Sequence, residues 1–273
     1  MKKSLKYFSI LIMILLVLTG CSEKKKEEKT TDEEAQKMLE AAITKMNDVE
    51  NFAMNVDATI GMSFEGSTIS MDMKASYEYD DEGNEYGLMS MSFLGYEEIQ
   101  ESYAITKDGY LYTYMNDGED NWYYIKEETP TEPTDEEENE QMLDMFKEIK
   151  IEDSDREGYT KIVVTVDATK MTDIYEQEET DIILENDLVM NVYLKDGYIS
   201  IIEFDASEIM NQLLSEEDFG MNMEVSAPMT IEITKIGQVE PIVVPNSILD
   251  SAKSYEDYMK DYEDEYYNEA VEV

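Results

Sequence analysis

Three methionine pairs are the first residues in this sequence whose type and spacing could do chemistry. Each pair has the form Met-x-Met: Met71 with Met73, Met89 with Met91, and Met221 with Met223. Paired thioethers are soft ligands of the kind that bind monovalent copper or silver. Alternating methionines also form one apolar face of a β-strand, and these pairs continue faces already occupied by other hydrophobic residues. The phase therefore favours a packing or binding surface over a metal site, and we expect no metal.

Cys21 is the second reactive group and the only cysteine of the chain. Three lysines in the first six residues precede an apolar run from Tyr7 to Leu18, and the small residues Thr19 and Gly20 stand directly before Cys21. This order is typical of a secretion signal that ends in a lipoprotein cleavage box. The run is too short to cross a bilayer, which takes about 20 apolar residues. We therefore expect a lipidated Cys21 that holds the protein on the extracytoplasmic side of the cell membrane.

The charge balance excludes several classes of function. The chain has 65 acidic and 21 basic residues and a formal net charge of −44. Such a chain repels nucleic-acid phosphates and anionic lipid headgroups, so we expect no nucleic acid and attachment to the membrane through Cys21 alone. A basic protein or another cationic partner stays open.

The inventory of side chains also argues against catalysis. Histidine is absent, which excludes triads and zinc sites that need an imidazole. No carboxylate pair stands out among the 65 acidic residues as a general acid and base. We expect no catalytic residues, no cofactor and no enzyme activity.

Two acidic segments, residues 80–85 and 116–121, gather oxygen ligands around a glycine and so resemble calcium loops. Neither extends to the twelve residues of a calcium-binding loop with its closing glutamate. Both lie between predicted strands, where Asn, Asp and Gly are favoured for the backbone of a turn. The turn interpretation is the preferred one.

The elements that must position these residues follow from hydrophobic periodicity. Thr31 and Glu34 form a capping-box pattern before an amphipathic helix that ends near Asn47, and from Phe52 the period changes from helical to two. Alternating segments at 52–64, 69–79, 88–93, 96–107, 110–115 and 122–126 predict an antiparallel meander. A second helix is predicted over Met142, Leu143, Met145, Phe146 and Ile149. Further strands follow at 162–166, 182–194, 198–206 and 221–233, and residues 242–245 are predicted to close the sheet.

The predicted organisation has four parts. Residues 1–20 are a lipoprotein signal peptide, and residues 21–30 form a flexible tether because residues 22–29 contain no apolar side chain. Residues 31–246 form the folded domain. Residues 247–273 are an acidic, tyrosine-rich segment that is either a docked helix or a solvated tail.

The order of these parts resembles a family. The helix Ala35–Met46, the segment Val49–Phe52 that opens methionine-rich strands, and Tyr110–Tyr112 followed by Asn121–Ile125 are similar to uncharacterised Gram-positive lipoproteins with a LolA/LppX-like fold. The resemblance covers residues 31–245. It implies an α+β fold: a strongly curved antiparallel sheet, an incomplete β-barrel, with helices covering its open concave side. It also implies a cavity that holds acyl chains and no catalytic residues.

Together these features predict a non-catalytic lipoprotein that binds a hydrophobic, lipid-like ligand in a half-barrel. The residues expected to line its cavity are apolar and alternate along three strands: Met54, Ile60, Met62, Met71, Met73, Met89, Met91 and Phe93. The alternative is a structural or sensory envelope module whose core is filled by its own side chains and whose acidic surface binds a partner. A soft-metal scavenger that uses the methionine pairs is a third interpretation.

Overall fold

The structure is a computed structural model of the whole chain. It describes residues 32–64, 67–118, 121–129, 143–171, 185–216 and 224–261. The predicted signal segment, Cys21, the tether, Met221 and Met223 lie outside these residues.

Thirteen strands form one sheet within this part of the chain. The strands of the first half are β1 (Phe52–Phe64), β2 (Ser67–Tyr79), β3 (Glu85–Phe93), β4 (Tyr96–Lys107), β5 (Tyr110–Asn116) and β6 (Trp122–Glu128). Those of the second half are β7 (Phe146–Glu152), β8 (Thr160–Val166), β9 (Leu188–Lys195), β10 (Tyr198–Asp205), β11 (Glu224–Ser226), β12 (Pro228–Thr234) and β13 (Lys253–Ser254). Their order is β13-β6-β5-β4-β3-β2-β1-β12-β10-β9-β8-β7, and β11 pairs with the far end of β1. The pairing of β1 with β12 joins the two halves.

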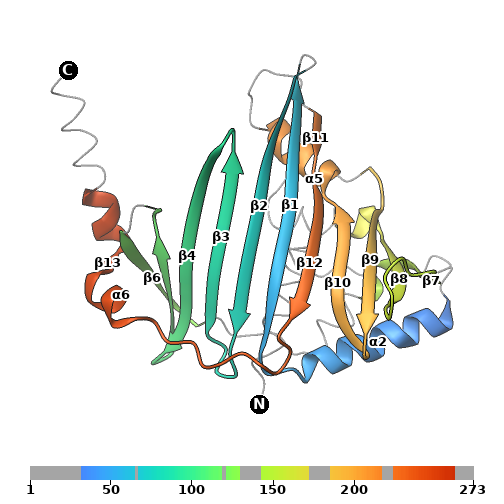
Figure 1. Cartoon of the computed structure of the whole chain (residues 1–273), viewed down its shortest axis with the longest axis horizontal. Helices are drawn as coiled ribbons and strands as arrows, with labels where there is room; N and C mark the ends of the chain where they lie inside the picture. The colour runs from blue at the N-terminus through green and yellow to red at the C-terminus, as the bar shows by residue number, and fades with distance from the viewer. Residues whose placement is uncertain are drawn as a thin grey trace.

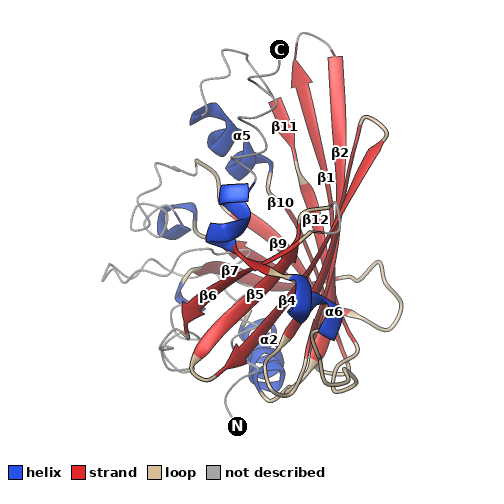
Figure 2. Cartoon of the chain, turned by 90° about the vertical axis from the view of Figure 1, so that its left-hand side faces the viewer, coloured by secondary structure: helices blue, strands red, loops and turns tan. Residues whose placement is uncertain are grey.

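The sheet is curved and open. Figure 1 shows the sheet face-on. In Figure 2 the outer strands of both halves curve toward the side of the sheet on which the helices α2 (Glu33–Asn47) and α5 (Ser207–Glu216) lie. All strand pairs are antiparallel except the short parallel pair of β13 and β6. A sheet with this many twisted strands curls, and the helices cover part of its apolar side. The predicted fold class, a strongly curved antiparallel sheet that is not closed into a barrel, is confirmed.

One face of the sheet carries the main core. We call it the inner face, and it includes Met54 and Val56 on β1, Ile231 on β12, Ile202 on β10 and Ile162 on β8, which follow one another across the register. These residues belong to one hydrophobic cluster that also contains the buried stripe of α2. The opposite, outer face of β1 and β2 carries Asn, Asp, Ser, Thr and Lys at the alternate positions. Strand periodicity thus separates an apolar side from a polar side.

Helix α2 forms where the sequence predicts it. Its N-cap is Asp32, whose Oδ1 accepts a hydrogen bond from the Glu34 amide at 2.9 Å, and not Thr31 as the capping-box pattern predicted. Its buried stripe, Ala35, Leu39, Ala42, Ile43 and Met46, packs on the inner face against β7 and β10. The helix therefore fills the concavity mainly over the second half of the sheet.

Two predicted elements are wrong. The second helix is instead the strand β7, preceded by one short helical turn at residues 143–144. A β-bulge between Phe146 and Glu148 turns both Phe146 and Ile149 toward the core, so an i, i+3 spacing that is typical of a helix arises in a strand. Residues 242–245 do not close the sheet either. They are irregular and lead to α6 (Asn246–Ser251), as Figure 1 shows.

A second, smaller cluster lies on the outer face of β4, β5 and β6. Val244 and Ile248 cover Tyr114 there, and the surrounding side chains are aromatic or apolar: Tyr103, Ile105, Tyr112, Trp122, Tyr124 and Ala252. The chain then passes the sheet edge through β13, and Tyr258 stacks on Tyr123 with ring centroids 4.7 Å apart. The part of the C-terminal segment that the structure describes is therefore docked on the edge of the sheet.

Candidate functional site: the methionine-rich inner face

The eight residues predicted to line a cavity lie on one face of three neighbouring strands. Strand register pairs Ile60 with Met71 and Met71 with Phe93, and it pairs Met73 with Met91 in the next row. Met54, Met62 and Met89 occupy the same face at even spacing along β1 and β3. Side chains at directly opposed positions have Cβ atoms about 5 Å apart, so they form a continuous apolar surface. We call this surface, made of the eight residues, the methionine face.

Burial falls steadily across the methionine face. Met54, at the end of β1 that meets the main core, is 0% exposed, and Ile60 and Met89 pack against the same core. Met62, Met71, Met73 and Met91 are half-buried, and Phe93 is 37% exposed. The described helices thus leave one end of this apolar face partly accessible.

A polar line on β4 borders the methionine face. Register places Gln100 opposite Met89, Glu98 opposite Met91 and Tyr96 opposite Phe93, all on the inner face. Glu98 is exposed, and the β5–β6 turn lies beside it: its Cγ is 3.8 Å from the place where a Cβ of residue 118 would stand. The apolar surface therefore ends one strand away from a carboxylate and an amide.

Glu85 marks the end of the inner face nearest the main core. It begins β3 opposite Tyr79, which is 1% exposed, and Ala104 on β4. Burial raises the pKa of Glu85 to about 7, although a hydrogen bond from the Tyr79 hydroxyl opposes this shift. Burial, with the nearby Glu85 carboxylate, also raises the pKa of Tyr77. A carboxyl that titrates near neutrality is thus built into the base of the site.

Gly87 lets the Tyr77 ring lie over strand β3 between the positions of Glu85 and Met89. Tyr77 is opposite Gly87 in the register, and a Cβ at residue 87 would stand 3.0 Å from the Tyr77 Cε1 and 2.6 Å from the Ser102 Oγ. A larger residue at position 87 would therefore displace one or both of these side chains.

The acidic segment at residues 80–84 is a structural turn. Asp80 is 2% exposed, and its carboxylate accepts hydrogen bonds from the amides of Glu82, Asn84 and Ile242 at 2.8 to 2.9 Å and from the Asn84 side chain at 2.9 Å. With its oxygens already used by N–H donors, Asp80 has little capacity left for a cation. The preferred turn interpretation fits this geometry.

The second acidic turn repeats the same device. The Asp117 carboxylate accepts hydrogen bonds from the amide and the side chain of Asn121, as Asp80 does from Asn84. Both turns have the form Asp-x-x-x-Asn, with Asp80 and Asn84 in the first and Asp117 and Asn121 in the second. The calcium-loop pattern does not include this spacing. Among the described residues, no group of three or more Asp, Glu, Cys or His side chains is arranged to hold a metal ion.

Basic side chains avoid the inner face of β1–β6. The three lysines on these strands, Lys74, Lys107 and Lys126, lie on the outer face by register, while Glu85, Glu98 and Glu127 lie on the inner face. After residue 31, the segments that the structure does not describe contain no lysine or arginine. On the neighbouring strand β13, Lys253 is in register with Tyr123 and forms an ion pair with Asp261. Within β1–β6, the charged side chains of the inner face are therefore all acidic.

The only arginine of the chain lies on the outer face of the second half. Arg156 forms an ion pair with Glu203 and lies over the ring of Tyr193, which is 2% exposed. The Tyr193 hydroxyl donates to Asp155 and Glu203, and burial together with these carboxylates raises the pKa of Tyr193 to about 12. This network fastens the loop before β8 to β9 and β10.

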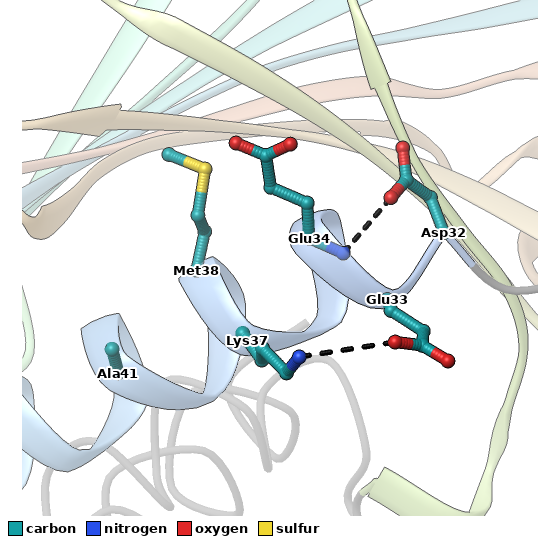
Figure 3. Close-up of a pocket in the computed structure, with 6 residues that line it drawn as sticks. All are labelled: Asp32, Glu33, Glu34, Lys37, Met38 and Ala41. Atoms are coloured by element: carbon teal, nitrogen blue, oxygen red, sulfur yellow. Dashed lines mark hydrogen bonds and ion pairs between the residues drawn. The ribbon is translucent and has the colours of Figure 1, made fainter.

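A cavity of about 550 Å³ lies along the first turns of α2 (Figure 3). Its described lining consists of Asp32, Glu33, Glu34, Lys37, Met38 and Ala41. Figure 3 shows Met38 and Glu34 pointing to one side of the helix, while Lys37 reaches Glu33, 3.8 Å away. None of the eight predicted residues lines this cavity.

Among the described residues, no helix is both long and apolar enough to cross a membrane. No protein-family model matches the chain, and no curated protein matches its sequence.

Several solved structures resemble the fold. LprF from Mycobacterium bovis is 13% identical with a TM-score of 0.38, and the match covers 79% of this chain and 97% of that one. The LolA superfamily protein NE2245 from Nitrosomonas europaea is 12% identical with a TM-score of 0.24, covering 78% and 96%. A β-barrel-like protein of unknown function from Brucella abortus is 12% identical with a TM-score of 0.27, covering 68% and 98%. These values are low, so function has to be inferred from the residues of this chain.

Proposed function

We propose that this protein is a lipoprotein, anchored through Cys21 on the extracytoplasmic side of the membrane, that binds a hydrophobic, lipid-like ligand on its methionine face without catalysis. The observation that carries the proposal is the half-buried row Met71, Met73 and Met91, which extends the main core beyond the reach of the described helices. Apolar surface of this kind, on a concave sheet, is a binding site for an apolar molecule.

Methionine suits such a surface. Its unbranched thioether side chain adapts to ligands of varied shape, and an acyl chain has no polar group for a more specific site to recognise. The same side chains would also accept a soft metal, but the methionines at paired register positions lie among Ile60, Ala75 and Phe93, which supply no further ligand.

The test combines native extraction with two matched variants. Apolar molecules that co-purify with the full chain are identified by mass spectrometry, and the same spectrum shows whether Cys21 carries a thioether-linked diacylglycerol. Binding of a pyrene-labelled long-chain alcohol is then compared in Met71→Asp and Ser70→Asp. Ser70 is the neighbour of Met71 on the outer face, and both variants add one carboxylate to β2.

We expect Met71→Asp to weaken binding at least about tenfold, because a carboxylate would be desolvated against the acyl chain. Ser70→Asp should bind as the unaltered protein does. Absence of any co-purifying lipid together with absence of probe binding would instead support the alternative, a module whose core is filled by its own side chains.

A further inference from the structure

The polar border of the methionine face specifies more than an apolar ligand, provided that the proposed function holds. Neighbouring strands lie about 4.8 Å apart, so a chain resting on Met73 and Met91 reaches β4 within one strand spacing. There it meets Glu98 in the same row and Gln100 in the row beside it. A molecule with an apolar tail and a polar head fits this sequence of side chains.

The charge of that head follows from the distribution of basic residues. The chain has 21 basic residues, of which seven lie before residue 32, and the other fourteen are all described. On β1–β6 every lysine lies on the outer face, and several of the other basic groups form local ion pairs, among them Lys37 with Glu33, Lys170 with Asp144, Arg156 with Glu203 and Lys253 with Asp261. An anionic head at Glu98 would meet no basic side chain of β1–β6 on this face, and the Glu98 carboxylate would repel it.

We infer that the methionine face selects amphiphiles with a cationic head, an amine or a quaternary ammonium group, whose head lies at Glu98 and Gln100 and whose tail lies on Met73 and Met91. Glu98 supplies the charge, and Gln100 supplies an amide oxygen that accepts a hydrogen bond from an amine. The β5–β6 turn lies beside Glu98, within van der Waals reach of its side chain at Gly118.

The experiment compares three probes that share one tail: hexadecyltrimethylammonium, 1-hexadecanol and hexadecyl sulfate. Each probe is added separately and at the same concentration, below that at which the two charged probes form micelles, to the purified full chain at 0.15 M ionic strength, which screens long-range attraction to the acidic surface over about 8 Å. After free amphiphile is removed, the bound probes are extracted and quantified by mass spectrometry.

Two variants isolate the contribution of the inner face. Glu98→Gln and Glu97→Gln each remove one negative charge from adjacent positions of β4 whose side chains point to opposite faces. Glu97 belongs to the outer face, where it accepts a hydrogen bond from Ser90 Oγ at 2.8 Å. Any effect of net charge alone is the same in both variants.

We expect the ammonium probe to be bound in the largest amount and the sulfate in the smallest. The ratio of bound ammonium to bound alcohol should fall about threefold in Glu98→Gln and stay unchanged in Glu97→Gln. Equal binding of all three probes, or a preference for the sulfate, would overturn the inference while leaving the proposed apolar site intact. An equal loss in both variants would also overturn it, because the preference would then come from the net charge. Binding of none of the probes would overturn both the inference and the proposed function.

Discussion

Glu85 should make the stability of this protein fall as the pH rises. Its pKa is about 7 in the folded state, against 4.5 as its ordinary value. Between these values the folded state holds a proton that the unfolded state has released, so the free energy of unfolding decreases with increasing pH. The stabilising effect is present in full below about pH 4.5 and is lost as the pH passes 7.

The magnitude follows from the two pKa values. A shift of 2.5 pH units corresponds to about 3 kcal/mol, because one unit is 1.36 kcal/mol. Glu85 is largely buried, so solvent does not screen this cost strongly. The groups that face it are Tyr77 and Tyr79 on β2 and the uncharged Ala104 on β4, and no basic side chain of the described residues lies on this face of β1–β6 to stabilise its ionised form.

The variant Glu85→Gln keeps the shape of the side chain and cannot ionise. We expect it to be more stable than the unaltered protein by less than about 1 kcal/mol at pH 5 and by about 3 kcal/mol at pH 8. Urea unfolding followed by the fluorescence of Trp122, the only tryptophan, measures both values. The comparison is made at each pH, so titration of the other carboxylates cancels.

Glu98→Gln is the control, because it removes one carboxylate from an exposed position on the same face. A stability difference between Glu85→Gln and the unaltered protein that is the same at pH 5 and pH 8 would refute the assignment of a raised pKa to burial. A difference that shrinks with increasing pH would mean that the ionised form is the one the fold stabilises.

Two further substitutions test the surroundings of the site by urea unfolding. Gly87→Ala should lower the free energy of unfolding by about 1 to 3 kcal/mol, because the added Cβ would overlap Ser102 and Tyr77. Adding Ser102→Ala should restore part of that loss. Equal stability of Gly87→Ala and the unaltered protein would contradict the close approach. Asp80→Ala should lower the free energy of unfolding by about 3 kcal/mol, because it leaves buried amide donors unsatisfied. Asp81→Ala, at an exposed position of the same turn, should lower it clearly less. A reversed order would contradict the role of Asp80.

The strand alternation could be predicted from the sequence, and with it the sharing of one face by all eight residues that were predicted to line a cavity. Period-two patterns fix the side of the sheet for each side chain once neighbouring strands pair in register, and the short turns Asp108-Gly109 and Asp196-Gly197 fix that register. Helix α2 was predicted correctly for a related reason, because its apolar residues recur at helical spacing over four turns.

The errors arose where local pattern and tertiary pairing disagree. Phe146 and Ile149 have helical spacing only because a bulge adds a residue to β7, and a bulge is decided by the partner strand β8. The polar border at Glu98 could not be recognised either, because the facing of a residue on β4 depends on its pairing with β3. The two turns could have been predicted from their Asp-x-x-x-Asn spacing. The facing of Lys107 and Lys126 depends on how β4, β5 and β6 pair.

Side chains of the inner face differ in a way that bears on affinity. Ile162 and Val164 on β8 and Ile202 on β10 are β-branched and buried in the main core, and such side chains have few rotamers. On β2 and β3 the inner face includes Met71, Met73, Met89 and Met91, which are only half-buried.

Fixing a methionine side chain costs up to about 1.5 to 2 kcal/mol of rotamer entropy, so ordering these four around a ligand opposes binding by several kcal/mol. The buried β-branched residues support the fold, while under the proposed function the half-buried methionines conform to apolar chains of different shapes at the expense of affinity. If the proposed function holds, selectivity then comes from the polar groups that border the methionine face. On β4 these groups are Glu98 and Gln100.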